Sequence, residues 1–337
     1  KLGYEDGAKA FSLVRLRRAR LSLSRNESVD VLRQKIDQID AKVVNLLNDR
    51  ASLAQRIGQT KSLSSQEVYV PHREKEILQR VRGLNRGPLS AQAVAAVFRE
   101  IISGCRSLEE PLRVAFFGAE ATYTHLAARE KFGSSADLRS TASIPEVFQE
   151  VSQGRATFGV VPIENSTEGA VTHTFDSLVD SDLQICAEIY LDIHHNLLSR
   201  SGKDADVERI ISHPQALAQC RGWLARRFPS IPVDEVASTA HAAMKAAKDG
   251  SLAAISSAMA KEVYNLQAVA ANIEDQSNNI TRFVVIGKMR TKPSRDDKTS
   301  LVFSVQDKPG VLHQMLQPFA RSRINLTKIE SRPIKNK

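Results

Sequence analysis

Two basic side chains stand in an apolar stripe near the start of the sequence, and their type and spacing suggest anion binding. Apolar residues recur every three or four positions from Leu32 to Ile57, which places them on one face of a helix. Arg50 and Lys61 lie on the same face. A charge on a buried face is costly unless a ligand or partner neutralises it, so the pair predicts an anionic small molecule between helices. Alternatively, both side chains reach solvent at the helix edge.

Polar side chains also gather in four loops farther along the chain, three of which connect an expected strand to an expected helix. These loops are Gly118–Thr124, Pro162–Gly169, Ser212–Ala216 and Asn278–Phe283. The ends of strands that face helix N-termini are where α/β proteins bind anions. The loops therefore predict a second site for an anionic small molecule. Since the chain has no Gly-x-Ser-x-Gly elbow, Ser166 is interpreted as a ligand-binding group and not as a nucleophile.

The first of the elements that must position these residues form a helical region at 29–108. Expected helices run from about 30 to 62, from 71 to about 83, and from 91 to about 108. The first is far longer than the mean helix of about 11–12 residues. Its apolar stripe needs a surface to cover it, so we expect a helical dimer.

From Leu112 onward, strands and helices alternate, which predicts an α/β region with two lobes. The expected strands are 113–117, 156–163, 183–191, 209–212, 253–256 and 282–287. After a charged linker at 288–298, a strand at 299–305, a helix at 310–323 and a strand at 325–331 predict part of a small α+β module. We expect the rest of that module to lie outside this chain.

Composition limits the classes of function that the chain can have. The 337 residues are 42% hydrophobic and 25% charged, as in soluble globular proteins. The three cysteines are far apart and fit neither a zinc site nor a disulfide framework, which favours a cytoplasmic protein. We expect neither a metal nor another cofactor. The net charge of +9 arises at the two ends of the chain, so it does not favour nucleic-acid binding. No apolar run approaches the length of a membrane span.

The helical region resembles the all-helical chorismate mutases. The matching stretches are Leu32–Asp37, Asn48–Arg50, Gly58–Lys61 and Pro71–Glu74. The resemblance implies an all-α three-helix domain in an intertwined dimer that rearranges chorismate to prephenate. It assigns carboxylate binding to Arg50 and to Arg33 of the partner chain, and contact with the ether oxygen to Lys61. Glu74 would bind the substrate hydroxyl, and Arg73 would be a further substrate-binding residue. This pericyclic reaction of a dianion needs positioning and charge stabilisation, not a nucleophile.

Glu109 is assigned a catalytic role by the same resemblance, although many chorismate mutases have glutamine there. An ionised carboxylate would oppose the negative charge that develops on the ether oxygen, and only the protonated acid donates a hydrogen bond. We therefore expect mutase activity to fall as pH rises. Alternatively, Glu109 simply begins an exposed linker.

The four loops resemble those of prephenate dehydratases, over about residues 112–287. The motifs are Glu164-Asn165-Ser166 with Gly169, Ser212-His213-Pro214-Gln215 and Thr281-Arg282-Phe283. The resemblance implies a two-lobed domain that converts prephenate to phenylpyruvate, with Thr281 assisting departure of the hydroxyl. The implied substrate-binding residues are Thr122, Thr124, Glu164, Asn165, Ser166, Thr167, Gly169, Ser212, His213, Gln215, Arg282 and Phe283. Two alternatives stay open, a structural ion pair for Arg282 and a structural role for His213.

The first loop departs from the pattern of this family. Ala119 and Ala121 replace proline and glycine, while hydroxyls remain at Thr122 and Thr124. An alanine does not readily adopt a positive φ, so we expect Ala121 to alter the shape of the loop.

The C-terminal stretches Lys308–Leu312 and Ile329–Pro333 resemble ACT regulatory modules. The resemblance implies that phenylalanine binds as an effector at a dimer interface, near Gly310, Val311, Leu312, Asn325, Glu330 and Ser331. With only part of the module present, we expect feedback inhibition to be weak or absent.

Together, these parts resemble the bifunctional chorismate mutase–prephenate dehydratases of phenylalanine biosynthesis. The expected division is a flexible basic segment at 1–28, a mutase domain at 29–110, a dehydratase domain at 111–288 and a partial ACT domain at 299–337. The rival hypothesis is a non-catalytic amino-acid sensor whose two lobes close on a ligand. Loss of turnover in Thr281→Ala would distinguish the enzyme from the sensor.

Overall fold

The computed structural model describes residues 28–63, 71–109, 111–291, 293, 297–306 and 308–331, without the side chains of residues 61–63 and 71–72. The three expected N-terminal helices are confirmed as α2 (Val29–Leu63), α3 (Pro71–Leu84) and α4 (Ala91–Ser107). Ser90 caps α4, because its side chain accepts a hydrogen bond from the backbone N–H of Ala93. The expectation of a flexible segment at 1–28 falls, apart from Ser28, outside the described residues.

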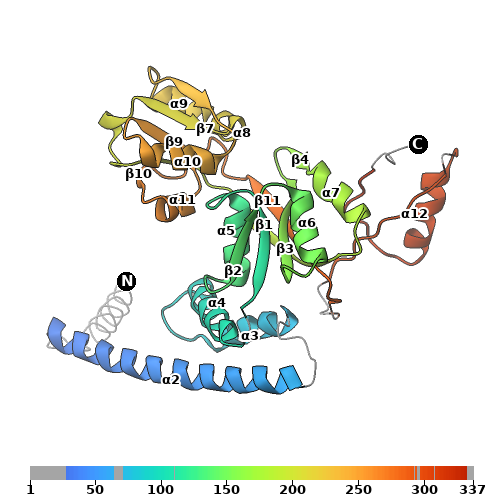
Figure 1. Ribbon diagram of the computed structural model, residues 1–337, viewed down its shortest axis with the longest axis horizontal. Coiled ribbons are helices and arrows are strands. Elements are labelled where there is room, and N and C mark those ends of the chain that lie inside the picture. Colours follow the sequence, from blue (N-terminus) through green and yellow to red (C-terminus); the bar gives the residue numbers. More distant parts are fainter. Residues whose placement is uncertain are drawn as a thin grey trace, which may run out of the picture.

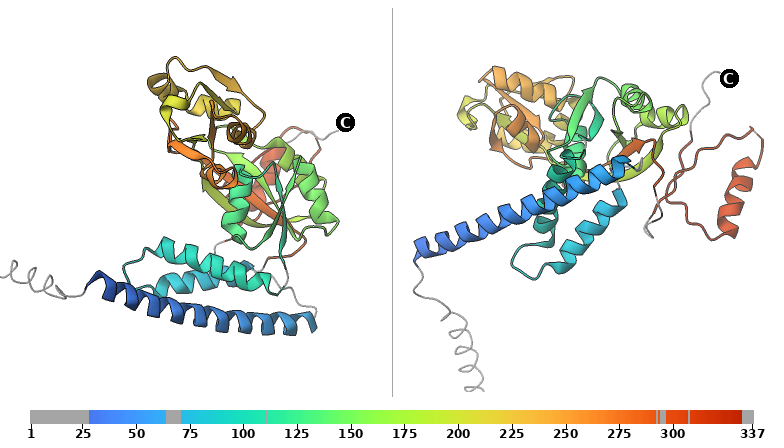
Figure 2. Two further views of the ribbon diagram at one scale, coloured as in Figure 1. Left: turned by 60° about the vertical axis from the view of Figure 1, so that its left-hand side comes forward. Right: turned by 60° about the horizontal axis from the view of Figure 1, so that its bottom comes forward.

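The apolar stripe of α2 is not covered by the parts of the chain that the structure describes. Ile36 and Leu46 are 56% and 67% exposed. The helix runs well past the ends of α3 and α4 (Figures 1 and 2). A helix of this length is stabilised mainly by packing of its apolar face. The stripe therefore needs a further surface, and a second copy of the chain stays the prediction.

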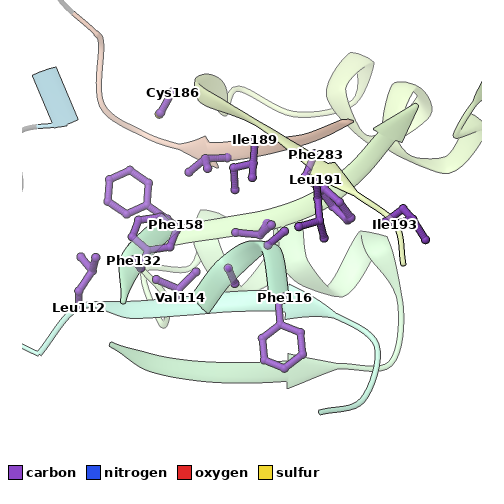
Figure 3. Close-up of a cluster of buried hydrophobic side chains, with 14 residues drawn as sticks. Leu112, Val114, Phe116, Phe132, Phe158, Cys186, Ile189, Leu191, Ile193 and Phe283 are labelled. Atoms are coloured by element: carbon purple, nitrogen blue, oxygen red, sulfur yellow. The ribbon is translucent and has the colours of Figure 1, made fainter. Parts of the chain in front are cut away.

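The first α/β lobe is built on a six-stranded mixed sheet in which β11 connects β3 with β5. The strands are β2 (Asp137–Thr141), β1 (Arg113–Phe117), β3 (Phe158–Asn165), β11 (Ile280–Gly287) and β5 (Gln184–Asp192), with β4 (Gly169–Ala170) beside β3. Helix α5 (Tyr123–Phe132) packs on one face, and α6 (Ile144–Ser152) and α7 (Thr172–Val179) pack on the other. Figure 3 shows the core beneath α5, where Phe132 and Phe158 stack.

The second lobe is a separate five-stranded sheet with helices on both faces. Its strand order is β10 (Gln267–Ala270), β6 (Asn196–Ser199), β9 (Leu252–Ser256), β7 (Arg209–Ser212) and β8 (Val233–Glu235). Its helices are η1 (Asp204–Asp206), α8 (Pro214–Gln219), α9 (Arg221–Arg227), α10 (Thr239–Lys248) and α11 (Ala258–Val263). The chain enters this lobe after β5 and returns through β11, so two segments join the lobes (Figure 1).

The six expected strands of the α/β region are confirmed with small shifts of their ends. Four strands of three to five residues were missed, namely β2, β6, β8 and β10. They are short, and β8 is exposed throughout. Such segments lack the long apolar run or clear alternation by which a strand is recognised in a sequence.

The C-terminal region differs from the prediction. Helix α12 (Val311–Arg321) is confirmed, but the strands expected at 299–305 and 325–331 are wrong, because the described residues there form no strand. A strand needs partners for its backbone groups, and two strands alone are marginal in water. The apolar side chains of Leu301 and Phe303 are accordingly more than half exposed. Over the described parts of the chain, no helix is long and apolar enough to cross a bilayer.

Candidate active sites

A hydrogen-bonded cluster of polar side chains lies where the two lobes meet, and Asn165 and Thr281 form its centre. They are opposite one another in the register of β3 and β11. Asn165 Nδ2 donates to Thr281 Oγ1 over 2.7 Å and to Asn279 Oδ1 over 2.9 Å. Both Asn165 and Thr281 are only 9% exposed. The structure thus brings together residues from the second and fourth predicted loops.

The orientation of the Asn165 amide follows from its other contacts. Asn165 Oδ1 accepts hydrogen bonds from the backbone N–H groups of Thr167 and Glu168, over 2.9 and 3.2 Å. The amide nitrogen must therefore face Thr281, whose hydroxyl oxygen accepts the bond. Since that hydroxyl also carries one proton, it can donate to a bound ligand. Burial makes this donor stronger than it would be in water.

The loop after β3 is tied to the start of β11. Ser166 Oγ accepts a hydrogen bond from the backbone N–H of Ile280 over 2.9 Å. Thr167 Oγ1 lies 3.5 Å from Asn279 Oδ1. Gly169 has a φ of +82°, a value that glycine adopts without strain, and it begins the short strand β4. These contacts hold the Asn165 loop against the start of β11.

Gln219 belongs to the cluster and was missed in the sequence. Its Oε1 accepts hydrogen bonds from Asn279 Nδ2 over 2.9 Å and from His195 Nε2 over 2.7 Å. Its own Nε2 is buried without a hydrogen-bond partner among the described residues. The sequence argument selected Gln215, one helical turn earlier on α8. The i, i+4 relation of the two glutamines was the available signal.

The third loop serves mainly to build the second lobe. His213 caps α8, because its Nδ1 accepts a hydrogen bond from the backbone N–H of Gln215. Ser212 is fully buried and donates to the carbonyl of Ile255 over 2.7 Å. These contacts support the structural alternative for His213 and account for Ser212 without a ligand.

The first loop keeps a left-handed residue despite its alanine, contrary to our expectation. Ala121 has a φ of 64° and is fully buried. Its backbone N–H donates to His125 Nδ1 over 3.0 Å, and its carbonyl accepts from Ser257 Oγ over 2.8 Å. These bonds offset the cost of the left-handed conformation, which is about 1–2 kcal/mol. Thr122 caps α5, and Thr124 is buried in its first turn.

Three other predicted residues lie away from the cluster. Side chains alternate along a strand, so Arg282 and Glu164 lie on the opposite face of the sheet from Thr281 and Asn165. Arg282 forms ion pairs with Glu188 and with Glu164, which favours the structural alternative left open above. Phe283, expected beside the substrate, is instead a core residue that is 1% exposed.

In the helical region, the ends of the three helices converge on Glu74 and Glu109. Glu74 opens α3 and pairs with Arg106 in the last turn of α4, over 2.5 Å. Glu109 lies against α2, because a Cβ atom added to Gly58 would be 2.9 Å from Glu109 Cγ. Gly58 is one helical turn from Lys61, whose side chain lies outside the description. Glu109 therefore packs against α2. The alternative, that Glu109 begins an exposed linker, predicted a residue without such a contact.

Arg106 is a further residue that the sequence did not single out. Its side chain is 8% exposed, and besides Glu74 it binds the carbonyl of Phe132 over 2.5 Å. Phe132 ends α5, the helix that begins with Tyr123. Beside this contact, Gly133 approaches Ser103 of α4 so closely that a Cβ atom would lie 2.4 Å from Ser103 Cβ. Arg106 thus connects the helical region with the first lobe.

The remaining basic residues of the helical region are spread along its surface. Arg33 is exposed and pairs with Asp30 over 3.4 Å, while Arg50 is half-buried. Seventeen residues of helix separate Arg33 from Arg50, which is about 25 Å at 1.5 Å per residue. One small dianion cannot contact both within a single chain. Arg73 is exposed and pairs with Glu76 over 3.0 Å.

The expected effector residues lie on or beside α12. Gly310 precedes this helix with a φ of +78°, and Val311 is its first residue. Val311 is half-buried, and Leu312, Asn325, Glu330 and Ser331 are exposed. Near them, Lys328 forms an ion pair with Glu164 over 2.8 Å. Within the described ranges, no three metal-binding side chains gather.

Three family models match separate parts of the chain. The model of prephenate dehydratase matches residues 114–291, that of type II chorismate mutase matches residues 32–110, and that of the ACT domain matches residues 299–337.

Full-length relatives and solved structures agree with these matches. The chain is 46% identical to a bifunctional chorismate mutase/prephenate dehydratase of Aquifex aeolicus, over 92% of this chain and 87% of the relative. The chain is 44% identical to the bifunctional chorismate mutase/prephenate dehydratase of Pseudomonas aeruginosa, over 91% of this chain and 86% of the relative. The crystal structure of prephenate dehydratase from Arthrobacter aurescens in complex with L-Phe is similar with a TM-score of 0.59 and 31% identity, covering 65% of this chain and 76% of that one.

Proposed function

The chain belongs to the family of bifunctional chorismate mutase/prephenate dehydratases, and from this premise we propose which residues serve each reaction. Its helical region is a chorismate mutase, its two-lobed region a prephenate dehydratase, and its C-terminal region an ACT domain. It is an enzyme of phenylalanine biosynthesis, so the alternative of a non-catalytic sensor is set aside. We propose the domain boundaries predicted from the sequence: a mutase domain at 29–110, a dehydratase domain at 111–288 and a partial ACT domain at 299–337.

For the dehydratase, the observation that carries the proposal is the 2.7 Å hydrogen bond from Asn165 to Thr281. Prephenate loses CO2 as the ring hydroxyl departs, and the electrons of the broken C–C bond complete the aromatic ring of phenylpyruvate. Asn165 holds the Thr281 oxygen as an acceptor, so the Thr281 proton is directed at the departing hydroxyl. Threonine is a weak acid, so its role is a positioned hydrogen bond that stabilises developing hydroxide.

Three side chains complete the proposed dehydratase site. Gln219 presents the buried amide nitrogen described above, which suits an oxygen of the substrate. Ser166 and Thr167 belong to the loop that holds Asn165. Glu164 and Arg282 lie on the other face of the sheet, so we assign them no contact with the substrate. Replacing Thr281 by alanine tests whether the Thr281 hydroxyl takes part in the reaction.

For the mutase, we propose a homodimer in which the Arg33 of one chain completes the site of the other. The exposed stripe of α2 and the separation of Arg33 from Arg50 support this arrangement. Guanidinium groups bind carboxylates through two parallel hydrogen bonds, which suits the two carboxylates of chorismate. Glu74 and Glu109 complete the site near the position of Lys61.

Complementation between two inactive chains tests the shared site. We expect the homodimers of Arg33→Ala and of Arg50→Ala to be nearly inactive as mutases. A mixed dimer, isolated with two different tags, should regain about half the wild-type mutase rate, because one of its two sites has both arginines. Dehydratase activity provides the control for folding. If the mixed dimer remains inactive, each site is built within one chain.

The pH dependence of the mutase tests the role of Glu109. The protonated acid can donate a hydrogen bond to the ether oxygen and the carboxylate cannot, so the wild-type rate should fall as pH rises from 5 to 9. The Glu109→Gln variant keeps a donor at every pH and should exceed the wild type at pH 9. Initial rates of chorismate consumption measure both. A flat wild-type profile with no gain in the variant would contradict this role.

For regulation, we propose that the ACT region binds phenylalanine, the amino acid that derives from the product. The support is its family match and the L-Phe complex of the Arthrobacter aurescens enzyme. Because both substrates are soluble metabolites, we also propose a cytoplasmic location.

A further inference from the structure

We propose that Tyr123 and His195 act together as a positioning pair that fixes the amide of Gln219, so that its N–H group points to an oxygen of prephenate. This inference rests on the dehydratase activity proposed above. It concerns Tyr123, which binds His195, and His195, which binds Gln219. Tyr123 comes from the first lobe, His195 from the segment after β5, and Gln219 from α8 of the second lobe.

The direction of each hydrogen bond is determined by the fixed donors at one end of the cluster. The backbone N–H groups of Thr167 and Glu168 oblige Asn165 to present its oxygen to them. Asn165 therefore donates to Asn279 Oδ1, and Asn279 donates to Gln219 Oε1. Gln219 Oε1 is thereby an acceptor. The amide nitrogen of Gln219 must be its free end, and this atom is buried with no hydrogen-bond partner among the described residues.

The protonation of His195 follows from the same chain. Gln219 Oε1 is an acceptor 2.7 Å from His195 Nε2, so Nε2 must carry hydrogen. In the neutral ring, Nδ1 is then an acceptor, and the Tyr123 hydroxyl donates to it over 2.8 Å. The single Tyr123 proton is shared with the carbonyl oxygen of His194, which also only accepts and lies 2.9 Å away. Tyr123 thus supports the neutral tautomer of His195 that can hold Gln219.

The surroundings keep both groups in these states. Burial lowers the pKa of His195, so the ring is neutral at pH 7, although Glu274 favours its charged form. Burial also raises the pKa of Tyr123 well above its usual value, so the phenol remains protonated. Glu274 accepts hydrogen bonds from the backbone N–H of His195 and from the ring of His194, which anchors the segment.

An unpartnered buried amide nitrogen is costly, and a ligand oxygen would remove that cost. If Gln219 could rotate by half a turn, its oxygen would face the carboxylates of prephenate and repel them. His195 opposes this rotation, because Nε2–H can donate to an oxygen but not to an NH2 group. The pair therefore raises the fraction of enzyme that is competent to bind the substrate.

Kinetics of three variants test the proposal, with the mutase activity of the same chain as the internal control for folding. Gln219→Met removes the donor and should lower dehydratase kcat/KM by about 10- to 100-fold. His195→Ala should approach the same loss. Tyr123→Phe should lower kcat/KM by about 5- to 10-fold, since it removes one hydrogen bond. Tyr264→Phe is the matched control, because its hydroxyl binds only the Glu120 carbonyl in this structure and should have no effect.

The double variant separates positioning from a merely structural role. In His195→Ala/Gln219→Met, the loss should equal that of Gln219→Met alone, because His195 acts only through Gln219. If the loss in the double variant equals the product of the two single losses, the proposal is overturned.

Nitrogen NMR of the wild type should show His195 protonated at Nε2 and not at Nδ1. The other tautomer would also overturn the proposal. If Gln219→Met is harmless, Gln219 is no donor. If Thr281→Ala is harmless as well, the proposed dehydratase site itself is wrong.

Discussion

Replacing Thr281 by alanine should lower the turnover number of the dehydratase by about 100-fold or more, with little change in the mutase rate. In the proposed dehydratase site, Asn165 orients the Thr281 hydroxyl as a hydrogen-bond donor, and a positioned donor of this kind contributes about 10²–10⁴-fold. Alanine also leaves Asn165 Nδ2 with Asn279 as its remaining acceptor. Phenylpyruvate formation from prephenate measures the effect directly.

Thr281→Ser is the matched control, since it keeps the hydroxyl at the same place in β11. It should retain most of the activity. Chorismate consumption by the same sample shows whether the variants are folded. A turnover number of Thr281→Ala within about threefold of the wild type would exclude this hydroxyl from the chemical step, whatever happens to KM.

Replacing Arg106 by methionine should destabilise the protein by about 3 kcal/mol or more and also impair the mutase. Removing one member of a buried ion pair takes away the closest opposite charge of the other, which typically costs about 3–5 kcal/mol. Arg106 and Glu74 are 8% and 20% exposed, so solvent screens them little. The variant also removes the hydrogen bond to the Phe132 carbonyl. Chemical denaturation and chorismate kinetics measure the two effects.

Two comparisons identify the source of the Arg106 effect. Arg209→Met breaks an exposed ion pair with Asp234 and should change stability by less than about 1 kcal/mol. Adding Glu74→Gln to Arg106→Met should recover part of the stability, because it removes the charge that Arg106 had balanced, but it should not recover the mutase activity. If Arg106→Met is as stable as Arg209→Met, the pair does not hold the two regions together.

Local patterns in the sequence predicted much of this protein. The spacing of apolar residues gave the length of α2, and Ser90 marked the start of α4. The buried strands β1, β3 and β11 were recognisable because their apolar runs are continuous. Asn165 and Thr281 lie in loops at the ends of such strands, and they became candidates because their motifs resemble those of prephenate dehydratases. All of these signals arise within a few residues of one another.

Other features depend on contacts that no local pattern contains. The sequence did not mark Gln219, His195 or Arg106 as site residues. Each was identified by a hydrogen bond to a partner that lies 24 to 72 residues away in the sequence. Ala121 adopts its positive φ because Ser257, far along the chain, binds its carbonyl. The strands expected at 299–305 and 325–331 did not form, since strand residues need neighbours as well as propensity.

The sequence by itself therefore determined the helices of the N-terminal region, the long strands of the α/β region and the polar residues at their ends. Only the tertiary structure decided which donor and acceptor atoms of these side chains face one another. The physical reason is the direction of hydrogen bonds: a donor at Thr167 fixes Asn165, then Asn279, and finally the free amide of Gln219 in the other lobe.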